Sequence, residues 1–156
     1  YMCEKNSKGI VVLVNKWDLI EKDQNTMIKF EANLREQLAP FNDVPIIFTS
    51  AIEKQRIHKA LETAMQVFEN RTRKIPTHQL NEVMLEVIAQ TPPPANKGKY
   101  IRIKFVQQLP TYSPSFAFFC NLPQYLTEAY KRYLENRLRE HFNFEGVPIR
   151  IFFRKK

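Results

Sequence analysis

The stretch that decides the fold is Gly9-Ile10-Val11-Val12-Leu13-Val14-Asn15-Lys16-Trp17-Asp18, an apolar run followed at once by polar side chains. The run shows no polar alternation, which is typical of a strand covered on both faces in a parallel sheet. A second run, Pro45-Ile46-Ile47-Phe48, predicts a neighbouring strand. Between the two, apolar residues recur at helical spacing from Met27 to Leu38, just before Pro40, and predict an amphipathic helix. The first part of the chain is therefore expected to be α/β.

A further helix is predicted after the second strand, because apolar residues recur at helical spacing from Ile57 to Phe68. The loops that end the two strands hold the strongest chemical signal. In an open α/β sheet, ligands bind beyond the carboxyl ends of the strands, and here these ends carry Asn15-Lys16-Trp17-Asp18 and Thr49-Ser50-Ala51. Guanine offers two adjacent donors, N1–H and the exocyclic amine, and one ionised carboxylate accepts both. Asn15-Lys16-Trp17-Asp18 resembles the Asn-Lys-x-Asp element of guanine-nucleotide-binding proteins. This resemblance implies that Asp18 selects guanine, whereas Trp17 suits packing as well as recognition.

The basic charge lies in the second part of the chain. Residues 1–70 hold nine basic and ten acidic side chains, and residues 71–156 hold fifteen basic and six acidic ones. A short basic stretch, Arg71-Thr72-Arg73-Lys74-Ile75-Pro76, separates the halves and ends in a proline that disfavours helix at the preceding residue. We therefore expect one domain over residues 1–75 and another over residues 76–156.

The second domain is predicted to be α+β, with the order helix, strand, strand, helix, strand and both helices on one face of a three-stranded sheet. A helix stripe runs from Leu80 to Ile88, and a second one from Leu126 to Leu138 follows a possible capping residue, Thr127. The predicted strands are Tyr100–Phe105, Ser115–Cys120, which is expected to pair antiparallel with the first, and Pro148–Arg154.

Alternation along the outer strands predicts which side chains face water. Apolar residues, Ile101, Ile103, Phe105, Ile149, Ile151 and Phe153, are expected to point inward. The intervening residues, Arg102, Lys104, Arg150, Phe152 and Arg154, would then collect on the opposite face. Cations interleaved with an aromatic ring are typical of an RNA-binding surface. A solvated basic face, or one that docks on a neighbouring domain, fits the same pattern.

Taken together, these motifs resemble the EngA/Der family of bacterial GTPases. The resemblance rests on Val-Asn-Lys-Trp-Asp-Leu-Ile-Glu-Lys-Asp from Val14, on Tyr-Lys-Arg-Tyr-Leu-Glu-Asn from Tyr130 and on Gly-Val-Pro-Ile-Arg-Ile from Gly146. It implies the end of a P-loop GTPase domain, with Rossmann-like parallel strands, followed by a KH-like domain. It also implies a role in assembly of the large ribosomal subunit. The expected partners are the 50S subunit or its RNA and the upstream GTPase domains.

The resemblance also assigns roles within the guanine loops. Asn15 would brace the two loops and approach N7, the stem of Lys16 would lie over the ring, and the backbone N–H of Ala51, next to Ser50, would meet O6. GTP or GDP and magnesium are expected cofactors of the intact protein. The Gly-x-x-Gly loop by which a typical KH domain clamps a nucleic-acid backbone is missing, which favours the sheet face or a composite surface for RNA contact.

Phosphate-binding motifs are missing from the chain. Its three glycines, Gly9, Gly98 and Gly146, form neither a Gly-x-x-x-x-Gly-Lys-Ser/Thr loop nor an Asp-x-x-Gly loop. This chain alone is therefore expected to bind no nucleotide detectably and to be inactive, and the phosphate-handling part is expected upstream of Tyr1. Two alternatives stay open. One is an RNA- or protein-docking module without nucleotide function, and the other is a single-GTPase, Era-like relative.

The location and assembly of the chain are expected as follows. No apolar run approaches the roughly 18 residues of a membrane-spanning helix, and Cys3 and Cys120 lie far apart, so a cytoplasmic protein without membrane contact is expected. The histidines, His58, His78 and His141, have no ligand spacing with the cysteines, so neither a metal site nor a catalytic constellation is predicted. A sheet that lacks its first strands would also expose an apolar edge, through which self-association is expected.

Overall fold

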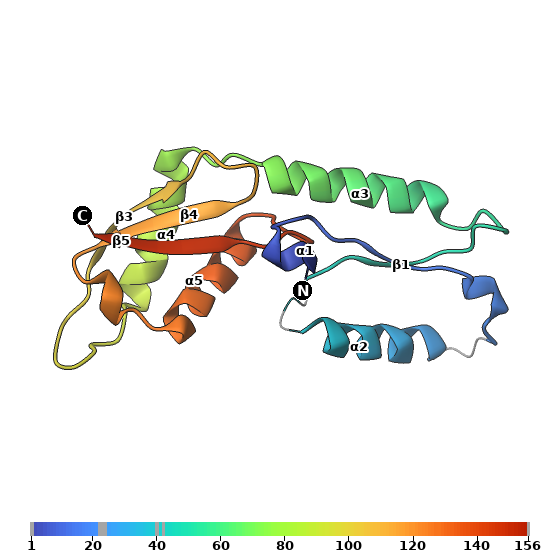
Figure 1. The fold of residues 1–156 in the computed structure, drawn as a ribbon, viewed down its shortest axis with the longest axis horizontal. Coiled ribbons are helices and arrows are strands. Elements are labelled where there is room, and N and C mark those ends of the chain that lie inside the picture. Colours follow the sequence, from blue (N-terminus) through green and yellow to red (C-terminus); the bar gives the residue numbers. More distant parts are fainter. Residues whose placement is uncertain (1, 22–24, 40, 42, 156) are drawn as a thin grey trace. The chain divides into compact units, whose positions relative to one another are not determined.

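The computed structural model describes residues 2–21, 25–39, 41 and 43–155. The chain forms two compact units, which are described separately (Figure 1). The first comprises Tyr1–Arg71 together with Glu145–Pro148, and the second comprises Thr72–Phe144 together with Ile149–Lys156. The chain is thus mixed α/β, and the first unit takes four residues from late in the sequence.

The first unit contains the expected strand, helix, strand arrangement. Its elements in chain order are α1 Met2–Lys5, β1 Val12–Val14, the 3-10 helix η1 Trp17–Leu19, α2 Thr26–Leu38, β2 Ile46–Phe48 and α3 Ile57–Thr72. Strands β1 and β2 pair in parallel, with Val12 opposite Ile46 and Val14 opposite Phe48. Pro40, which was expected to follow the helix, lies outside the described residues.

Burial in the first unit differs from the prediction. The run before Asn15 was expected to be covered on both faces, but Leu13 is 52% exposed. Helix α2 contains no buried residue, and Phe30 on it is 41% exposed. On α3 the side chains of Leu61 and Phe68 also face water. The apolar pattern was identified correctly, but several of its side chains are more than half exposed.

The segment Glu145–Pro148 completes the first unit. Backbone N–H of Ile10 donates to the carbonyl of Gly146 (2.8 Å), and Gly146 N–H donates to the carbonyl of Asp43 (3.1 Å). The buried amide of Asn70 donates to the carbonyl of Glu145 (3.1 Å). Gly146 has φ +72°, and a Cβ there would lie 2.8 Å from the carbonyl oxygen of Ile10. Glycine is required because a side chain would meet both left-handed strain and backbone.

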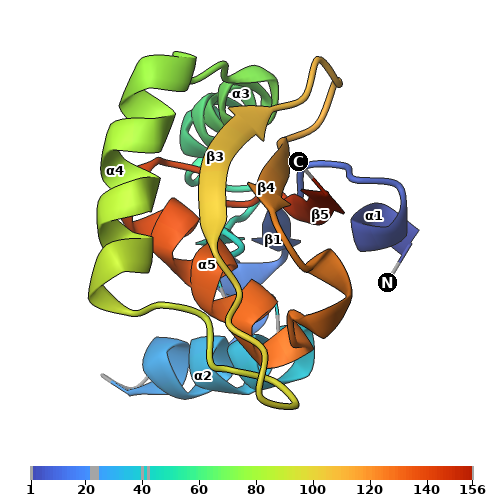
Figure 2. The same cartoon turned by 90° about the vertical axis from the view of Figure 1, so that its left-hand side faces the viewer.

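The second unit has the predicted element order and one three-stranded sheet. Its elements are α4 Thr77–Gln90, β3 Ile103–Gln108, β4 Ser115–Cys120, the 3-10 helix η2 Pro123–Tyr125, α5 Glu128–His141 and β5 Arg150–Lys155. The strand order is β3-β4-β5, with β3 antiparallel and β5 parallel to β4. Helices α4 and α5 lie together on one side of the sheet (Figure 2). The antiparallel β3–β4 pair and the three-stranded sheet were both predicted.

Both helices and the inward side chains of the sheet share one continuous core. Leu80 and Met84 of α4, Leu134 and Leu138 of α5 and Phe118 of β4 are fully buried in it. Together these contacts let a two-layer arrangement bury one face of the sheet. The predicted cap is also confirmed, since the Thr127 hydroxyl accepts from the Tyr130 N–H (3.2 Å) at the start of α5.

Side-chain amides replace backbone partners around β3. The Asn81 amide of α4 accepts from Val106 N–H (2.8 Å) and donates to Val106 carbonyl (2.7 Å). The Gln108 amide similarly accepts from Ile75 N–H (2.8 Å) and donates to Arg73 carbonyl (2.8 Å). The Asn81 pair satisfies backbone groups of the edge strand β3, and the Gln108 pair satisfies backbone groups in the segment that leads into α4.

Strand β3 begins three residues later than predicted. The backbone at Tyr100 and Arg102 is held instead by Asn121, whose amide donates to Tyr100 carbonyl (3.1 Å) and accepts from Arg102 N–H (2.8 Å).

Among the described residues, no helix is long and apolar enough to cross a membrane.

Candidate guanine-binding loops and basic sheet face

The two candidate guanine loops leave the sheet of the first unit at the same edge. Residues Asn15–Asp18 follow β1 and residues 49–51 follow β2, and these strands are parallel neighbours. Thr49 N–H donates to Val14 carbonyl (2.8 Å), and Trp17 N–H donates to Thr49 carbonyl (3.1 Å). The parallel pairing therefore continues past the strands and holds the two loops side by side.

Asn15 joins the loops through its side chain. Its Oδ1 accepts from the backbone N–H of Ala51 (3.3 Å). That N–H is the group that the family resemblance assigns to guanine O6, so in this structure it is already donated. Ser50 is fully buried, and its hydroxyl accepts from Glu53 N–H (3.2 Å), which fixes the turn after β2. Ser50 therefore has a structural role in the loop, whereas Ala51 is exposed.

Asp18 presents an unused acceptor. It lies in η1, the 3-10 helix that begins directly after Lys16. Lys16 adopts a left-handed conformation (φ 59°, ψ 34°) and has an exposed side chain. Oδ1 of Asp18 is buried and has no hydrogen-bond partner among the described residues. A buried acceptor without a partner loses its hydration uncompensated, by about 1–3 kcal/mol or more for a charged group.

Trp17 packs inside the first unit. It is only 3% exposed, and its ring centroid lies 4.4 Å from that of Phe48 and 5.7 Å from that of Phe30. The sequence left packing and recognition open for this residue. The three rings show that it packs, and they anchor η1 against β2 and α2.

On the second unit, the residues predicted to form the basic, aromatic surface are exposed. The exposed set comprises Arg102, Lys104, Arg150, Phe152 and Arg154. Their apolar neighbours in the sequence, Ile101, Ile103, Ile149 and Ile151, are buried in the core, as predicted. Register places Phe152 of β5 beside Ala117 and Arg154 beside Phe119. Because side chains alternate along a strand, Arg150, Phe152 and Arg154 lie on the face of β5 opposite the core. That face, together with the exposed Arg102 and Lys104, is called the outer face from here on.

Phe105 does not point inward as predicted. The β3–β4 register shifts between Ile103, which is opposite Cys120, and Phe105, which is opposite Phe119. Such a bulge inserts one residue and turns the following side chains to the other face. Phe105 therefore lies on the outer face, with its ring centroid 5.9 Å from that of Phe119.

Sequence analysis missed both of these aromatic residues. Phe119 follows Phe118 in an apolar strand, and no alternation marks which of the two faces the core. Phe105 looked inward because the alternation from Ile101 predicts it, and no glycine or proline signals the bulge at Lys104. A register shift depends on the partner strand, which a single strand's sequence does not specify.

Comparison with known proteins identifies the family of the chain. A family model described as the KH-domain-like of EngA bacterial GTPase enzymes, C-terminal, matches residues 74–154. GTPase Der of Christiangramia forsetii is 60% identical over all 156 residues, and GTPase Der of Flavobacterium psychrophilum is 57% identical over the same length. GTPase Der of Porphyromonas gingivalis is 59% identical over 154 residues.

The chain belongs to the EngA/Der family of bacterial GTPases. It spans about a third of the length of the curated relatives it matches, 36% for the first two and 35% for the third. The matched part is the C-terminal part, which contains the KH-like domain. This membership replaces the single-GTPase alternative considered from the sequence.

Proposed function

We propose that this chain is the C-terminal part of a GTP-binding protein that acts in assembly of the large ribosomal subunit. The first unit is the end of a P-loop GTPase domain and supplies guanine specificity, and the second is a KH-like domain that docks on ribosomal RNA. GTP or GDP and magnesium bind only in the intact protein, because the phosphate-binding motifs are absent from this chain.

The observation that carries this proposal is the paired loop arrangement in the first unit. Two loops at the ends of parallel strands are joined by the Asn15–Ala51 hydrogen bond, and the buried Oδ1 of Asp18 beside them has no partner among the described residues. A carboxylate so placed matches the adjacent N–H groups of guanine. The base contact alone offers one or two charge-assisted hydrogen bonds of about 1.5–3 kcal/mol each. Binding by this chain alone is therefore expected to be no tighter than about millimolar.

The test of guanine recognition uses the full-length protein with Asp18→Asn. Xanthine carries a carbonyl where guanine carries the exocyclic amine, so an amide donor at residue 18 suits it better than a carboxylate. We expect the affinity for GDP to fall at least a hundredfold and that for xanthosine diphosphate to rise. Calorimetry measures both, and Glu62→Gln on α3 is the control. Unchanged preference for GDP would show that Asp18 does not read the base.

RNA docking by the outer face is supported by the exposed cations of β3 and β5 and by the charge of the second unit. This unit holds fourteen basic and five acidic side chains, and the first is close to neutral. Arg102→Glu with Arg150→Glu is expected to lower the affinity for ribosomal RNA and to reduce its salt dependence by about one unit of slope per lost contact. A matched double variant on α5, Lys131→Glu with Arg132→Glu, is the control.

Equal losses in the two double variants would indicate general charge effects and not docking by the outer face. No loss in either, with RNA binding intact, would reject the outer face. If this face instead docks on the upstream GTPase domains, the outer-face variant will keep RNA affinity in the isolated chain. It will then weaken the contact with those domains, which a pull-down of the separate pieces measures.

Self-association of this chain is a smaller proposal. Large apolar side chains of the first unit, Leu13, Ile28, Leu61, Met65 and Phe68, are more than half exposed. Exposed apolar surface of this kind favours association between copies. Sedimentation of the chain over a range of concentrations tests it, and a monomer at all concentrations would contradict it.

A further inference from the structure

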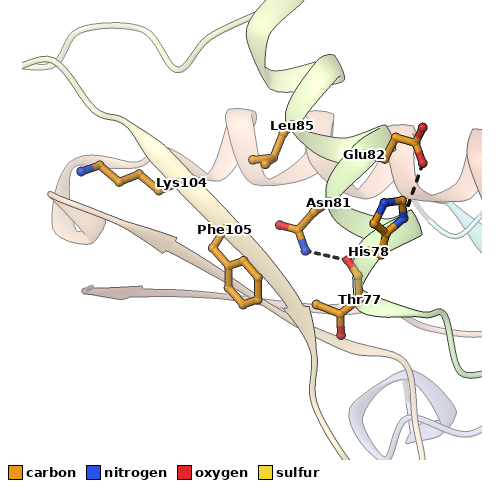
Figure 3. Close-up of a pocket in the computed structure, with 7 residues that line it drawn as sticks. All are labelled: Thr77, His78, Asn81, Glu82, Leu85, Lys104 and Phe105. Carbon is orange, nitrogen blue, oxygen red and sulfur yellow. Dashed lines mark hydrogen bonds and ion pairs between the residues drawn. The ribbon is translucent and has the colours of Figure 1, made fainter.

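The second unit contains a groove between helix α4 and the edge strand β3, with a volume of about 450 Å³. Seven residues line it: Thr77, His78, Asn81, Glu82, Leu85, Lys104 and Phe105 (Figure 3). Leu85 and Phe105 are half-buried and form the apolar part, while Lys104 and His78 are exposed. Figure 3 shows the α4 side chains on one side of the groove and Phe105 on the other.

The groove is built by two features described above. The register shift in β3 turns Phe105 away from the core and makes Lys104 the extra residue of the strand. Asn81 then holds α4 against the strand through its two hydrogen bonds to Val106, and it also donates to Thr77 carbonyl (2.7 Å). The walls therefore exist before any ligand arrives, which lowers the entropic penalty of binding.

The same Asn81 pair excludes one class of occupant. An extended peptide adds to a sheet by pairing with the free N–H and C=O groups of its edge strand. At Val106, in the middle of β3, both groups are already bonded to Asn81. A strand-forming peptide would have to break this pair, so the groove is poorly suited to strand addition.

Charge and ring chemistry favour a nucleotide. Lys104 lines the groove, with its ammonium directed away from the α4 side chains (Figure 3), and it belongs to a unit with fourteen basic and five acidic side chains, which attracts a polyanion. The Phe105 ring lines the groove and has a second ring, Phe119, as its neighbour, with the two centroids 5.9 Å apart. Single-stranded RNA is recognised in this way, by bases that stack on aromatic side chains and phosphates that meet cations.

We propose that this groove takes one base of single-stranded RNA, stacked on Phe105, with the adjoining phosphate at Lys104. The inference rests on the proposed RNA-docking function and adds a base-binding position to it. The tests of the two proposals differ in chemistry, since Arg102 and Arg150 contribute charge, whereas Phe105 contributes stacking.

The experiment measures fluorescence anisotropy of labelled twelve-nucleotide oligouridylate and oligoadenylate with the whole chain at several salt concentrations. Phe105→Leu keeps an apolar side chain but removes the ring, and we expect roughly tenfold weaker binding with an unchanged salt slope. Phe105→Tyr keeps the ring and should bind like the unchanged chain. Lys104→Gln should reduce the salt slope by about one. Tyr112→Leu, at an exposed tyrosine of the same unit, is the matched control.

A second measurement locates the base directly. Oligonucleotides that carry 4-thiouridine are photo-crosslinked, and the attached peptide is identified by mass spectrometry. We expect attachment within residues 103–108 or 77–85, and its loss in Phe105→Leu. Urea unfolding of each variant shows whether the second unit keeps its stability.

The outcomes separate the two proposals. If Phe105→Leu binds like the unchanged chain while Arg102→Glu with Arg150→Glu loses affinity, the groove inference is wrong and docking by the outer face stands. If the folded chain binds neither oligonucleotide nor ribosomal RNA, both fail. A tenfold loss in Phe105→Leu that Tyr112→Leu reproduces would also overturn the groove inference.

Discussion

The two units use similar apolar patterns with different results. In the second unit, α4, α5 and three strands bury a continuous core, with Leu80, Leu134 and Phe118 fully enclosed. In the first unit, α2 buries no residue and Leu13 on β1 is half exposed. A sheet of two strands is too small to cover its helices, whereas three strands and two helices enclose each other. The difference shows that an amphipathic pattern predicts an apolar helix face, but does not show whether that face is buried in this chain.

The largest expected effect removes a core ring from the second unit. Phe118→Ala should destabilise that unit by about 3–5 kcal/mol, because Phe118 is fully buried and the cavity cannot collapse completely. Phe68→Ala on α3, at a ring that is 62% exposed, should change stability by less than about 0.5 kcal/mol. Urea unfolding measures both. Equal effects would mean that the rings are equally buried in solution and would remove the contrast between the units.

The next effect concerns a glycine in the first unit. Gly146→Ala should lower its stability by about 2–4 kcal/mol, from left-handed strain and from a Cβ placed 2.8 Å from Ile10 oxygen and from Val67. Gly98→Ala is a close control, since Gly98 has φ +71° and open space around the position. Gly98→Ala should lower stability only through the left-handed backbone strain, by about 1–2 kcal/mol. Thermal unfolding compares them, and a larger loss at Gly98 would contradict the packing of the late segment.

A smaller effect is expected at the start of α5. Thr127→Ala removes the hydroxyl that accepts from Tyr130 N–H and should lower the stability of the second unit by about 1 kcal/mol. Thr63→Ala in α3 is the control, because that hydroxyl donates to a carbonyl of its own helix, Lys59, and caps nothing. Urea unfolding measures the stability of both variants, and equal losses would show that the Thr127 cap does not stabilise α5.

The smallest effect concerns the two thiols. Burial raises the pKa of Cys120 in β4, and a hydrogen bond with the Leu122 backbone offsets it only partly, whereas Cys3 is exposed. A thiol-specific disulfide reagent at pH 8 should therefore react at once with Cys3 and with Cys120 only when the second unit opens. Because the folded pKa is raised, the unfolded chain loses this proton first, and the stability of the second unit falls as pH rises above about 8.5. Cys3→Ser isolates the buried thiol, and rapid reaction of that variant would show that the core is open.

Much of the fold followed from sequence periodicity. The parallel β1–β2 pair, the element order of the second unit and the Thr127 cap were all predicted, because local patterns determine them. The register between strands and the exact ends of strands were harder to predict. The bulge that turns Phe105 outward depends on the register with β4, and the late start of β3 depends on the distant Asn121. Neither leaves a local signal.

The guanine loops show the same limit within one site. Strand order predicted that the two loops lie at one edge of the sheet, and the family resemblance implied that Asn15 braces them, as its hydrogen bond with Ala51 does. Strand order did not predict that Trp17 would pack between Phe30 and Phe48, nor that the left-handed turn at Lys16 would place Asp18 in a 3-10 helix. Such details depend on the packing of side chains from three elements.

The segment Glu145–Pro148 has a practical consequence for anyone who dissects this protein. The chain passes from one unit to the other at residues 71–72, 144–145 and 148–149, so neither unit is a continuous stretch of sequence. A gene fragment that encodes only residues 74–154 would take Gly146 and the fully buried Val147 away from Ile10 and Asp43. The first unit expressed alone would lack the residues 145–148 that pack against it. The second unit expressed alone would carry these residues without their packing partners. Boundaries drawn from family alignments therefore make poor cloning limits here.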